Sequence, residues 1–338
     1  MPRPDVTSQR PGRPDAAVAE VRVAVRTALA VVRPGDPVTV ACSGGADSLA
    51  LASAVAFEAS RAGLAAGAVT VDHGLQPGSA ERAADVVGVL RGLGFEPVII
   101  CAVAVEGPGG PEAAARRARY AALRSVQSAR GGWVALGHTL DDQAETVLLG
   151  LARGSGPRSL AGMVPAHFPW LRPLLTVRGT TTRAACAAQH LPVWDDPHND
   201  EPAYTRVRIR HELLPLMEDV LNGGVAAALA RTADLLREDC DALDEIVAEL
   251  AAGRLSHADP EVSVFTGLAP ALRRRLLRCW LHDVGGLTAA HLTAVDALVV
   301  DWHGQQAVAL PGGCEVRRSS GRLHLHFQPS REPPRVRR

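Results

Sequence analysis

The first half of the chain alternates short apolar runs with longer segments in which apolar residues recur at helical spacing. Four of the runs predict buried strands, at residues 37–42, 67–71, 97–105 and 132–136. Helical spacing predicts helices at residues 16–33, 47–62, 79–93, 111–130 and 143–153. Strands that alternate with helices in this way predict a parallel, doubly wound α/β sheet with right-handed crossovers.

After Gly154 the pattern changes, and residues that favour turns separate the apolar segments. Residues 170–175 and 194–204 are predicted as loops. Helical spacing continues in the segments 177–190, 206–217, 221–252 and 268–302, and strand-like runs follow at 307–310, 315–318 and 323–327. We therefore predict a second, mainly helical domain with a short strand-rich C-terminal end.

Composition narrows the chemistry. Basic and acidic residues number 36 each, so the net charge is zero and a nucleic acid would have to be held by local clusters. The sequence contains no lysine, so every basic residue is arginine. This excludes Walker-type phosphate loops, protein-kinase chemistry and Schiff-base catalysis, each of which needs a lysine amine.

The six cysteines are scattered and form no Cys-x-x-Cys pair or Cys/His cluster, which argues against a zinc or iron–sulfur site. Their mainly apolar contexts favour reduced core thiols of a cytoplasmic protein. No uninterrupted apolar segment is long enough to span a membrane, and the first 20 residues contain no hydrophobic signal region. We expect no membrane partner.

A glycine turn joins the first predicted strand to the helix after it. Two adjacent glycines can form a tight turn with exposed backbone N–H groups at the positive end of a helix, which is an arrangement that binds phosphate. The turn comprises Ser43, Gly44, Gly45, Ala46, Asp47 and Ser48. The alternative is an ordinary strand-to-helix turn in which Asp47 and Ser48 only cap the helix.

Polar residues also follow two other predicted strands. Asp72 and His73 end the second strand, and His138 ends the fourth. Ligands of parallel α/β sheets bind outside the carboxyl ends of the strands, so we expect these residues to meet the glycine turn at one nucleotide site. A histidine in such a position could instead be a turn residue.

Asp142 and Glu145 stand three residues apart at a helix start, so their carboxylates share one face. Together they could hold or deprotonate a cationic amine, or they could only stabilise the positive helix end. Arg116 and Arg119 likewise share a helix face, and either could stabilise charge on a transferred phosphoryl group.

The glycine turn resembles the loop of the N-type ATP pyrophosphatases, which split ATP between the α- and β-phosphates. Further blocks resemble the tRNA(Ile)-lysidine synthetases in the family's order. These blocks are Val71 to Leu75, Glu112 to Arg116 with Arg119 and Tyr120, Gly137 to Thr146, and a last group of Asp196, Pro197, Asn199, Tyr204, Arg206, Arg208 to Arg210 and Leu213 to Pro215.

The resemblance implies a ligase that uses ATP and Mg²⁺. Cytosine oxygen in the wobble position of tRNA(Ile) attacks the α-phosphate, and the amine of free L-lysine then displaces AMP from carbon 2. ATP would contact Ser43, Gly44, Gly45, Ala46, Asp47, Ser48, Asp72, His73 and His138. The implied catalytic residues are Asp47, which also binds the metal, Arg116, Asp142 and Glu145.

The resemblance also assigns binding groups. Lysine would be held by Asp142, Glu145 and Arg208. The tRNA would be held by Arg206, Arg210, Arg273 and Arg274, although the first two could pair with Glu212 or Asp219 and the last two could form a salt-bridged helix surface. The family usually has Asn where Val207 stands and Ser where His198 stands, which puts local contacts in doubt.

The predicted domains follow from these assignments. They are a disordered leader (1–20), a PP-loop catalytic domain (21–217), a helical tRNA-binding domain (218–303), a strand-rich end that resembles a truncated family module (304–330), and a basic tail (331–338). The oligomeric state stays open, and a homodimer is compatible with the sequence.

Two other classes of function are alternatives to a lysine ligase. Another enzyme with the same loop could thiolate tRNA or make GMP, NAD or asparagine, but the chain has no cysteine pair for sulfur transfer and no visible glutamine-hydrolysing domain. A non-catalytic nucleotide- or RNA-binding module would not need the charged residues at the strand ends.

Overall fold

The computed structural model describes residues 14–327 apart from residue 75, the segments 108–109, 155, 197–203 and 256–258, and the side chains of 111 and 112. Most of the predicted leader, the whole basic tail, and Leu75, Pro197, His198 and Asn199 therefore lie outside the described residues. The chain divides into two compact units. One comprises residues 1–149 and 162–232, and the other comprises residues 150–161 and 233–338.

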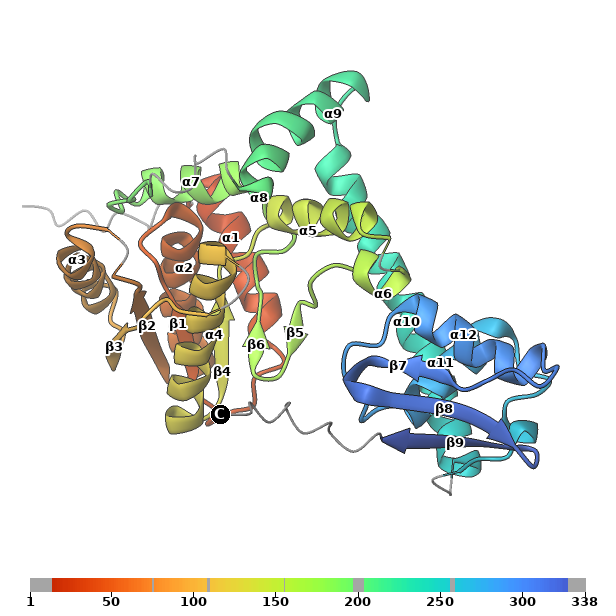
Figure 1. Cartoon of the computed structure of the whole chain (residues 1–338). Coiled ribbons are helices and arrows are strands. Elements are labelled where there is room, and N and C mark those ends of the chain that lie inside the picture. Colours follow the sequence, from red (N-terminus) through yellow and green to blue (C-terminus); the bar gives the residue numbers. More distant parts are fainter. Residues whose placement is uncertain are drawn as a thin grey trace, which may run out of the picture. The chain divides into compact units, whose positions relative to one another are not determined.

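The first unit is built on a six-stranded sheet with strand order β3-β2-β1-β4-β6-β5 (Figure 1). Its strands are β1 (Val38–Ala41), β2 (Ala66–Asp72), β3 (Val98–Ala102), β4 (Trp133–Leu136), β5 (Ala166–His167) and β6 (Trp170–Leu171). All neighbouring pairs are parallel except β5 and β6. The predicted parallel α/β fold is confirmed.

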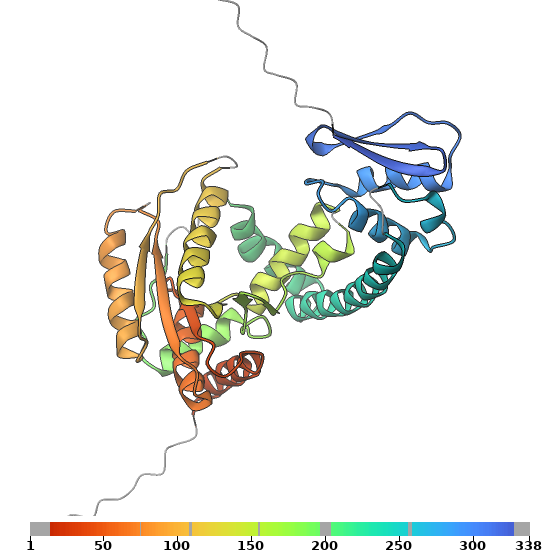
Figure 2. The ribbon, with the colours of Figure 1, turned by 90° about the horizontal axis from the view of Figure 1, so that it is seen from below.

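Helices cover both faces of this sheet, as Figure 2 shows for α3 and α4 on opposite sides of the strands. Because side chains alternate along a strand, Val38 and Val40 pack with one set of helices while Ala41 packs with another. The first set is α1 (Ala16–Leu29), α2 (Ala46–Ala62), α3 (Ser79–Gly92) and α7 (Gly179–Ala188). The other face is covered by α4 (Gly110–Arg130).

The remaining helices of this unit form a separate small core. They are α5 (Leu140–Ala152), α8 (Thr205–Arg208), the π-helical turn η2 (Ile209–Leu213), α9 (Leu214–Val220) and the start of α10 (Val225–Arg254). Leu140, Ala144 and Leu148 on α5 pack against Ile209, Leu214 and Ala226. This packing places the basic segment that ends in α9 beside the acidic start of α5.

Two helix starts differ from the sequence prediction by three residues or more because side chains cap the helices. α5 begins at Leu140, three residues before the predicted start, since Thr139 and Asp142 bond reciprocally to each other's backbone N–H. α10 begins at Val225 instead of residue 221, where the carboxylate of Glu218 accepts hydrogen bonds from the N–H groups of Val225 and Ala226. The strands β5 and β6 were missed, because two residues are too few to show an alternating pattern.

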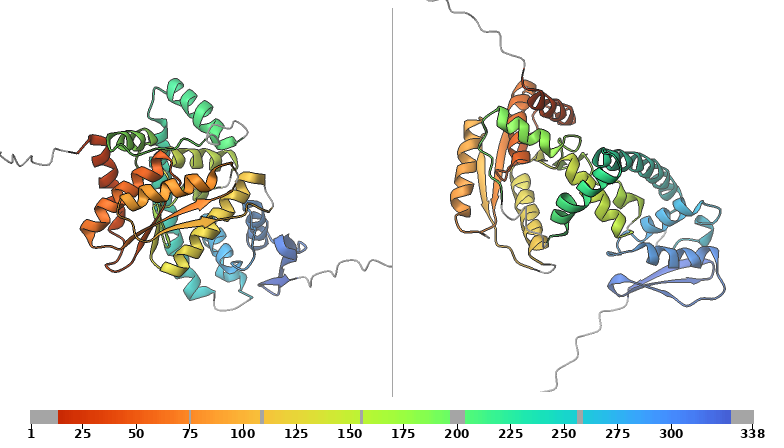
Figure 3. Two further views of the ribbon diagram at one scale, coloured as in Figure 1. Left: turned by 90° about the vertical axis from the view of Figure 1, so that its left-hand side faces the viewer. Right: turned by 90° about the horizontal axis from the view of Figure 1, so that it is seen from above.

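The second unit contains the short helix α6 (Pro157–Leu160), most of α10, α11 (Pro270–Trp280) and α12 (Ala289–Val300). A three-stranded antiparallel sheet follows, made of β7 (Val308–Leu310), β8 (Cys314–Ser319) and β9 (Arg322–Phe327). Figure 3 (right) shows this sheet along one side of the helices. The core joins Phe265, Leu276 and Leu298 to Val316 and Leu323 of the sheet. The strand-rich end is confirmed.

Within residues 14–327 as described, no single helix is both long and apolar enough to cross a bilayer, although the segments 205–220 and 225–254 pass that test when taken together.

Candidate active site

The glycine turn adopts the conformation that a phosphate loop requires. Gly44 has φ +88°, and a Cβ atom there would lie 2.8 Å from a methyl group of Val86, so only glycine fits. Ser48 closes the loop, because its Oγ accepts from the Ser43 N–H at 3.1 Å and donates to the Gly45 carbonyl at 2.9 Å. Gly45 is the N-cap of α2 and has no capping side chain, so the N–H groups of the first turn stay available to an anion.

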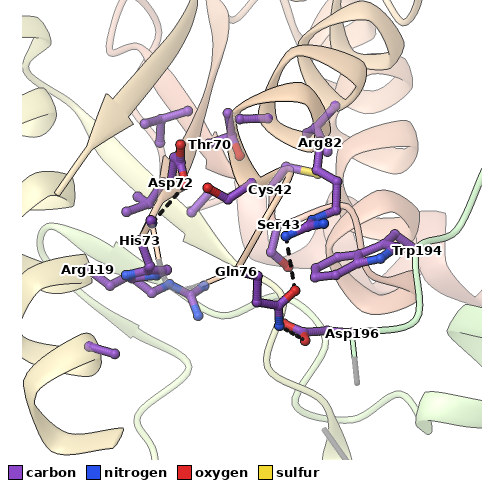
Figure 4. Close-up of a pocket in the computed structure, with 18 of the residues that line it drawn as sticks. Cys42, Ser43, Thr70, Asp72, His73, Gln76, Arg82, Arg119, Trp194 and Asp196 are labelled. Atoms are coloured by element: carbon purple, nitrogen blue, oxygen red, sulfur yellow. Dashed lines mark hydrogen bonds between the residues drawn. The ribbon is translucent and has the colours of Figure 1, made fainter. Parts of the chain in front are cut away.

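A cavity of about 540 Å³ opens beside this loop (Figure 4). It is lined by Ser43 from the loop, Asp72 and His73 from the end of β2, and Asp142 and Glu145 from α5. Because β1, β2 and β4 are parallel, their carboxyl ends bring these residues to one edge of the sheet. The fold therefore brings Ser43, Asp72 and His73 together at this edge, as the sequence predicted.

His138 is placed differently. It does not appear among the lining residues of the cavity, and burial lowers its pKa to about 3, so the imidazole is neutral at physiological pH. Its Nδ1 is buried without a hydrogen-bond partner. The pKa of His73 is also lowered, first by burial and then by the positive charge of Arg119. Asp72 accepts a hydrogen bond from the Gly74 N–H at 2.9 Å, which lowers its pKa and fixes the turn after β2.

The acidic pair lines the cavity, and one of its members also caps a helix. Asp142 uses Oδ2 to cap α5 through Thr139, and its Oδ1 accepts from Arg210 Nη2 at 3.0 Å. Glu145 is fully buried, and its Oε1 accepts from Arg210 Nε at 2.7 Å. Arg206 Nη1 lies 3.9 Å from Oε2 of Glu145, and that oxygen accepts no hydrogen bond from the residues that the structure describes.

Burial raises the pKa of Glu145 to about 7, with Arg210 as the strongest opposing influence. A carboxyl group with a pKa near neutrality is suited to general acid–base work at physiological pH. The capping interaction of Asp142 stabilises the helix start, and the same side chain also lines the cavity.

The two arginines of α4 that share a helix face differ in their surroundings. Arg119 lines the cavity, whereas Arg116 is exposed and stacks over the ring of Tyr120 at 5.0 Å. Within the described part of the chain, no carboxylate forms an ion pair with Arg119. Of these two arginines, Arg119 is therefore the one whose guanidinium faces the cavity.

Asp47 lies in the first turn of α2 but is not among the residues that line the cavity. Burial raises its pKa to about 6, and the hydroxyl of the buried Thr182 donates a hydrogen bond to its Oδ1. Its Oδ2 accepts no hydrogen bond from any described residue. Mg²⁺ is commonly held by one or two carboxylates together with substrate phosphates, so a single carboxylate oxygen at a phosphate loop fits this ion.

The remaining predicted arginines separate into three groups. Arg206 and Arg210 line the cavity. Arg208 is 63% exposed and pairs with Glu212 at 2.9 Å, so the structure does not bring it to the site. In the second unit Arg273 is buried and paired with Asp296, while Arg274 beside it is 50% exposed and its Nε lies 3.5 Å from Oδ2 of the same carboxylate.

Sequence reasoning missed the wall of the cavity formed by Gln76, Arg82 and Trp194. Trp194 could have been noticed as an aromatic residue in a polar, turn-rich segment next to Asp195 and Asp196. Arg82 carries no such signal, because it is one of several charged residues on a helix.

Two family models and several known proteins are similar to this chain. A model of the PP-loop domain matches residues 20–217, and a model of the TilS substrate binding domain matches residues 261–324. A solved structure, the U34-tRNA thiolase NcsA from Methanococcus maripaludis with its [4Fe-4S] cluster, shares the fold with a TM-score of 0.55. It is 19% identical and covers 65% of this chain and 80% of its own. The fold and the loop thus define an ATP-binding enzyme of the PP-loop class.

Three curated relatives are named tRNA(Ile)-lysidine synthase. The protein of Leifsonia xyli is 54% identical over 87% of this chain and 90% of its own. That of Streptomyces coelicolor is 55% identical over 86% of each chain, and that of Thermobifida fusca is 53% identical over 92% of this chain and 98% of its own. The chain belongs to the tRNA(Ile)-lysidine synthase family, as the sequence motifs predicted.

Proposed function

We propose that the protein ligates free L-lysine to carbon 2 of the wobble cytidine of tRNA(Ile) with a CAU anticodon, with ATP split to AMP and pyrophosphate. One observation carries the proposal. A single cavity joins a phosphate loop without lysine to a buried carboxylate, Glu145, whose Oε2 lacks a hydrogen-bond donor. A buried acceptor without a partner is costly, and an ammonium group would satisfy it.

In the first step, the exocyclic oxygen of cytosine attacks the α-phosphorus of ATP. The bond from that phosphorus to the bridging oxygen breaks, and pyrophosphate leaves with the electron pair. The loop N–H groups and Ser43 hold the phosphates, and Arg119 stabilises the negative charge on the transferred phosphoryl group. Mg²⁺ bound by Asp47 would neutralise part of the phosphate charge.

In the second step, the amine of lysine attacks carbon 2 of the adenylated ring. The bond from that carbon to oxygen breaks, and AMP leaves with the oxygen. Glu145 accepts a proton from lysine, and the loss of this proton makes the amine nucleophilic. The raised pKa of Glu145, about 7, lies closer to the pKa of an amine than the pKa of an ordinary carboxylate does. Asp142 and Arg210 position Glu145.

The assignments of several arginines change with this geometry. Arg210 is bonded to both members of the acidic pair, so we remove it from the tRNA-binding group. We also remove Arg208 from the lysine-binding group, because it pairs with Glu212 away from the site. Arg206 at the cavity and the exposed Arg274 keep the assignment to tRNA phosphates, since both have accessible guanidinium groups. Arg273 loses it, because its side chain is buried in an ion pair.

Sulfur transfer is not favoured as a second function. Cys42 is the cysteine found among the described cavity residues, and burial raises the pKa of its thiol, which suppresses the reactive thiolate. The homodimer and the cytoplasmic location stay predictions, and sedimentation of the purified protein would test the first.

The test is to incubate the purified protein with ATP, radiolabelled lysine and the CAU-anticodon tRNA(Ile). We expect lysine in the tRNA with one pyrophosphate released for each lysine bound. Asp47→Ala should abolish pyrophosphate release, and Asp36→Ala, at a half-buried position before β1 and away from the cavity lining, is the control. Absence of both lysine incorporation and pyrophosphate release from the wild type would contradict the proposal.

A further inference from the structure

Arg82, on the first turn of α3, lines the cavity and has no role in the steps above. Its guanidinium lies over the ring of Trp194, 4.7 Å from the ring centroid. Its Nη1 donates to the Pro77 carbonyl at 3.1 Å and its Nη2 to Gln76 Oε1 at 3.0 Å, while Gln76 Nε2 donates to Asp196 Oδ1 at 2.9 Å. The side chain is therefore held in one orientation.

This orientation leaves the charge of Arg82 available. Its partners are a carbonyl, an amide and an aromatic ring, and no ion pair joins it to a carboxylate among the residues that the structure describes. A fixed guanidinium that borders a cavity and lacks a counter-ion is suited to bind an anion in several hydrogen bonds.

The position of Arg82 relative to the phosphate loop follows from its neighbours. Val86 lies one helical turn after Arg82 and packs against Gly44 so closely that a Cβ there would be 2.8 Å away. The Trp194 N–H donates to the Gly44 carbonyl at 3.0 Å. Both residues that flank Arg82 thus contact Gly44, and Arg82 stands at the Gly44 side of the loop.

Arg119 marks the other side of the loop. Its charge acts on His73 and Asp142, which places it toward the acidic pair. Figure 4 shows Arg119 with His73 on one side of Cys42 and Ser43, and Arg82 with Trp194 on the other. The cavity therefore has a cation at each side of the loop that would hold the phosphates.

The direction of phosphoryl transfer distinguishes the two arginines. The attacking and leaving oxygens lie roughly in line on opposite sides of the α-phosphorus. Under the proposed function, on which this inference rests, the acceptor base and lysine approach from the acidic pair and Arg119. Pyrophosphate then departs on the opposite side, where Arg82 stands.

We propose that Arg82 is a catalytic residue that binds the pyrophosphate leaving group, with Trp194 and Gln76 as its positioning residues. When the α-phosphorus to oxygen bond breaks, the electron pair passes to pyrophosphate, and the N–H groups of Arg82 stabilise the added charge. The lysine-free loop thus receives from α3 a cation that Walker-type loops carry themselves.

Binding of magnesium pyrophosphate and of AMP, measured by calorimetry, tests this role without catalysis. Arg82→Gln should lower the affinity for magnesium pyrophosphate about tenfold or more, as expected for loss of a charge-assisted contact. AMP affinity should stay unchanged. Arg82→Lys should restore part of the loss, and Trp194→Leu should weaken pyrophosphate binding less than Arg82→Gln. Arg91→Gln, at an exposed position of the same helix, is the matched control.

Equal pyrophosphate affinity in wild type and Arg82→Gln would overturn the inference, as would an equal loss of pyrophosphate and AMP binding, which indicates a distorted loop. Should Arg82→Gln not fold, the Arg82→Lys variant decides on the same criteria. The proposed function is judged separately by lysine incorporation in the wild type. A wild type that incorporates lysine while Arg82→Gln binds pyrophosphate normally refutes only the role of Arg82.

Discussion

Arg210 donates a hydrogen bond from Nε to Oε1 of Glu145 at 2.7 Å, although 65 residues separate them in the sequence. The same guanidinium reaches Asp142, so one cation organises both members of the acidic pair. Arg210 lies in the π-helical turn η2, and such turns often occur at functional sites. The bond leaves Oε2 of Glu145 as the oxygen that a substrate amine can use.

Glu145→Gln should separate the two chemical steps. The amide keeps the shape of the side chain but cannot take a proton, so lysine incorporation should fall by about 10²–10⁴-fold, the usual contribution of a general base. Pyrophosphate release in a single turnover should change by only a few-fold. Glu212→Gln, whose carboxylate pairs with Arg208 on an exposed helix face, is the control. An equal loss of both steps would show that Glu145 acts before lysine does.

Arg119→Gln and Arg116→Gln should differ sharply. Loss of a cation that stabilises transferred phosphoryl charge costs about 10²–10³-fold in rate by analogy with other preorganised donors, so Arg119→Gln should impair pyrophosphate release to that extent. Arg116→Gln should stay near wild type, because its side chain is exposed and rests on Tyr120. If Arg116→Gln proved the more damaging change, the assignment made from the sequence would be restored.

The pH dependence of stability should carry the mark of Glu145. Burial raises its pKa to about 7 from the ordinary value of 4.5, so the folded protein binds the proton more tightly than the unfolded chain. The associated stability is fully present below about pH 4.5 and is lost as pH rises through 7. Glu145→Gln removes this loss, so its melting temperature relative to wild type should rise between pH 5 and pH 8.

His138 should act in the opposite direction. Burial lowers its pKa to about 3 from the ordinary value of 6.5, so the stability linked to it is present above pH 6.5 and is lost as pH falls toward 3. His138→Gln should therefore lose less stability than wild type on acidification from pH 7 to pH 5, as followed by thermal unfolding. A wild-type slope in His138→Gln would mean that the histidine is solvated in the folded protein.

Asp296→Ala should destabilise the second unit because it leaves Arg273 buried without its counter-ion. Removal of one partner from a buried ion pair costs about 3–5 kcal/mol. Glu261→Ala breaks a more exposed pair with Arg322 and should cost about 1 kcal/mol or less. Chemical denaturation measures both, and similar losses in the two variants would contradict the structural role of Arg273.

Arg274→Ala should weaken tRNA binding with little change in stability.

Much of the fold could be predicted because it rests on local patterns. The apolar runs gave β1 to β4, helical spacing gave the helices between them, and the three short strands at the C-terminal end were also anticipated. Helix starts were less predictable. Those of α5 and α10 depend on capping by Asp142 and Glu218, whose side chains act on backbone groups that the apolar pattern does not reveal.

The candidate site residues also separate into those that the sequence predicts and those that it does not. The glycine turn, Asp72, His73, Asp142 and Glu145 could be predicted, because parallel strands must deliver their carboxyl ends to one edge of the sheet. Arg116 and Arg119 could not be told apart from the sequence, since residues three apart differ by only about 60° around a helix. The placement of α4 against the sheet decided which one faces the cavity.

The sequence by itself therefore determined the family, the phosphate loop and the edge of the sheet at which the chemistry occurs, because these depend on spacing within short segments. Only the tertiary structure decided that Arg210 serves Glu145, that Arg273 is buried, and that Arg82 rests on Trp194. Each of these contacts joins side chains distant in sequence. Their geometry is set by how helices pack on one another and on the sheet, and no local pattern encodes it.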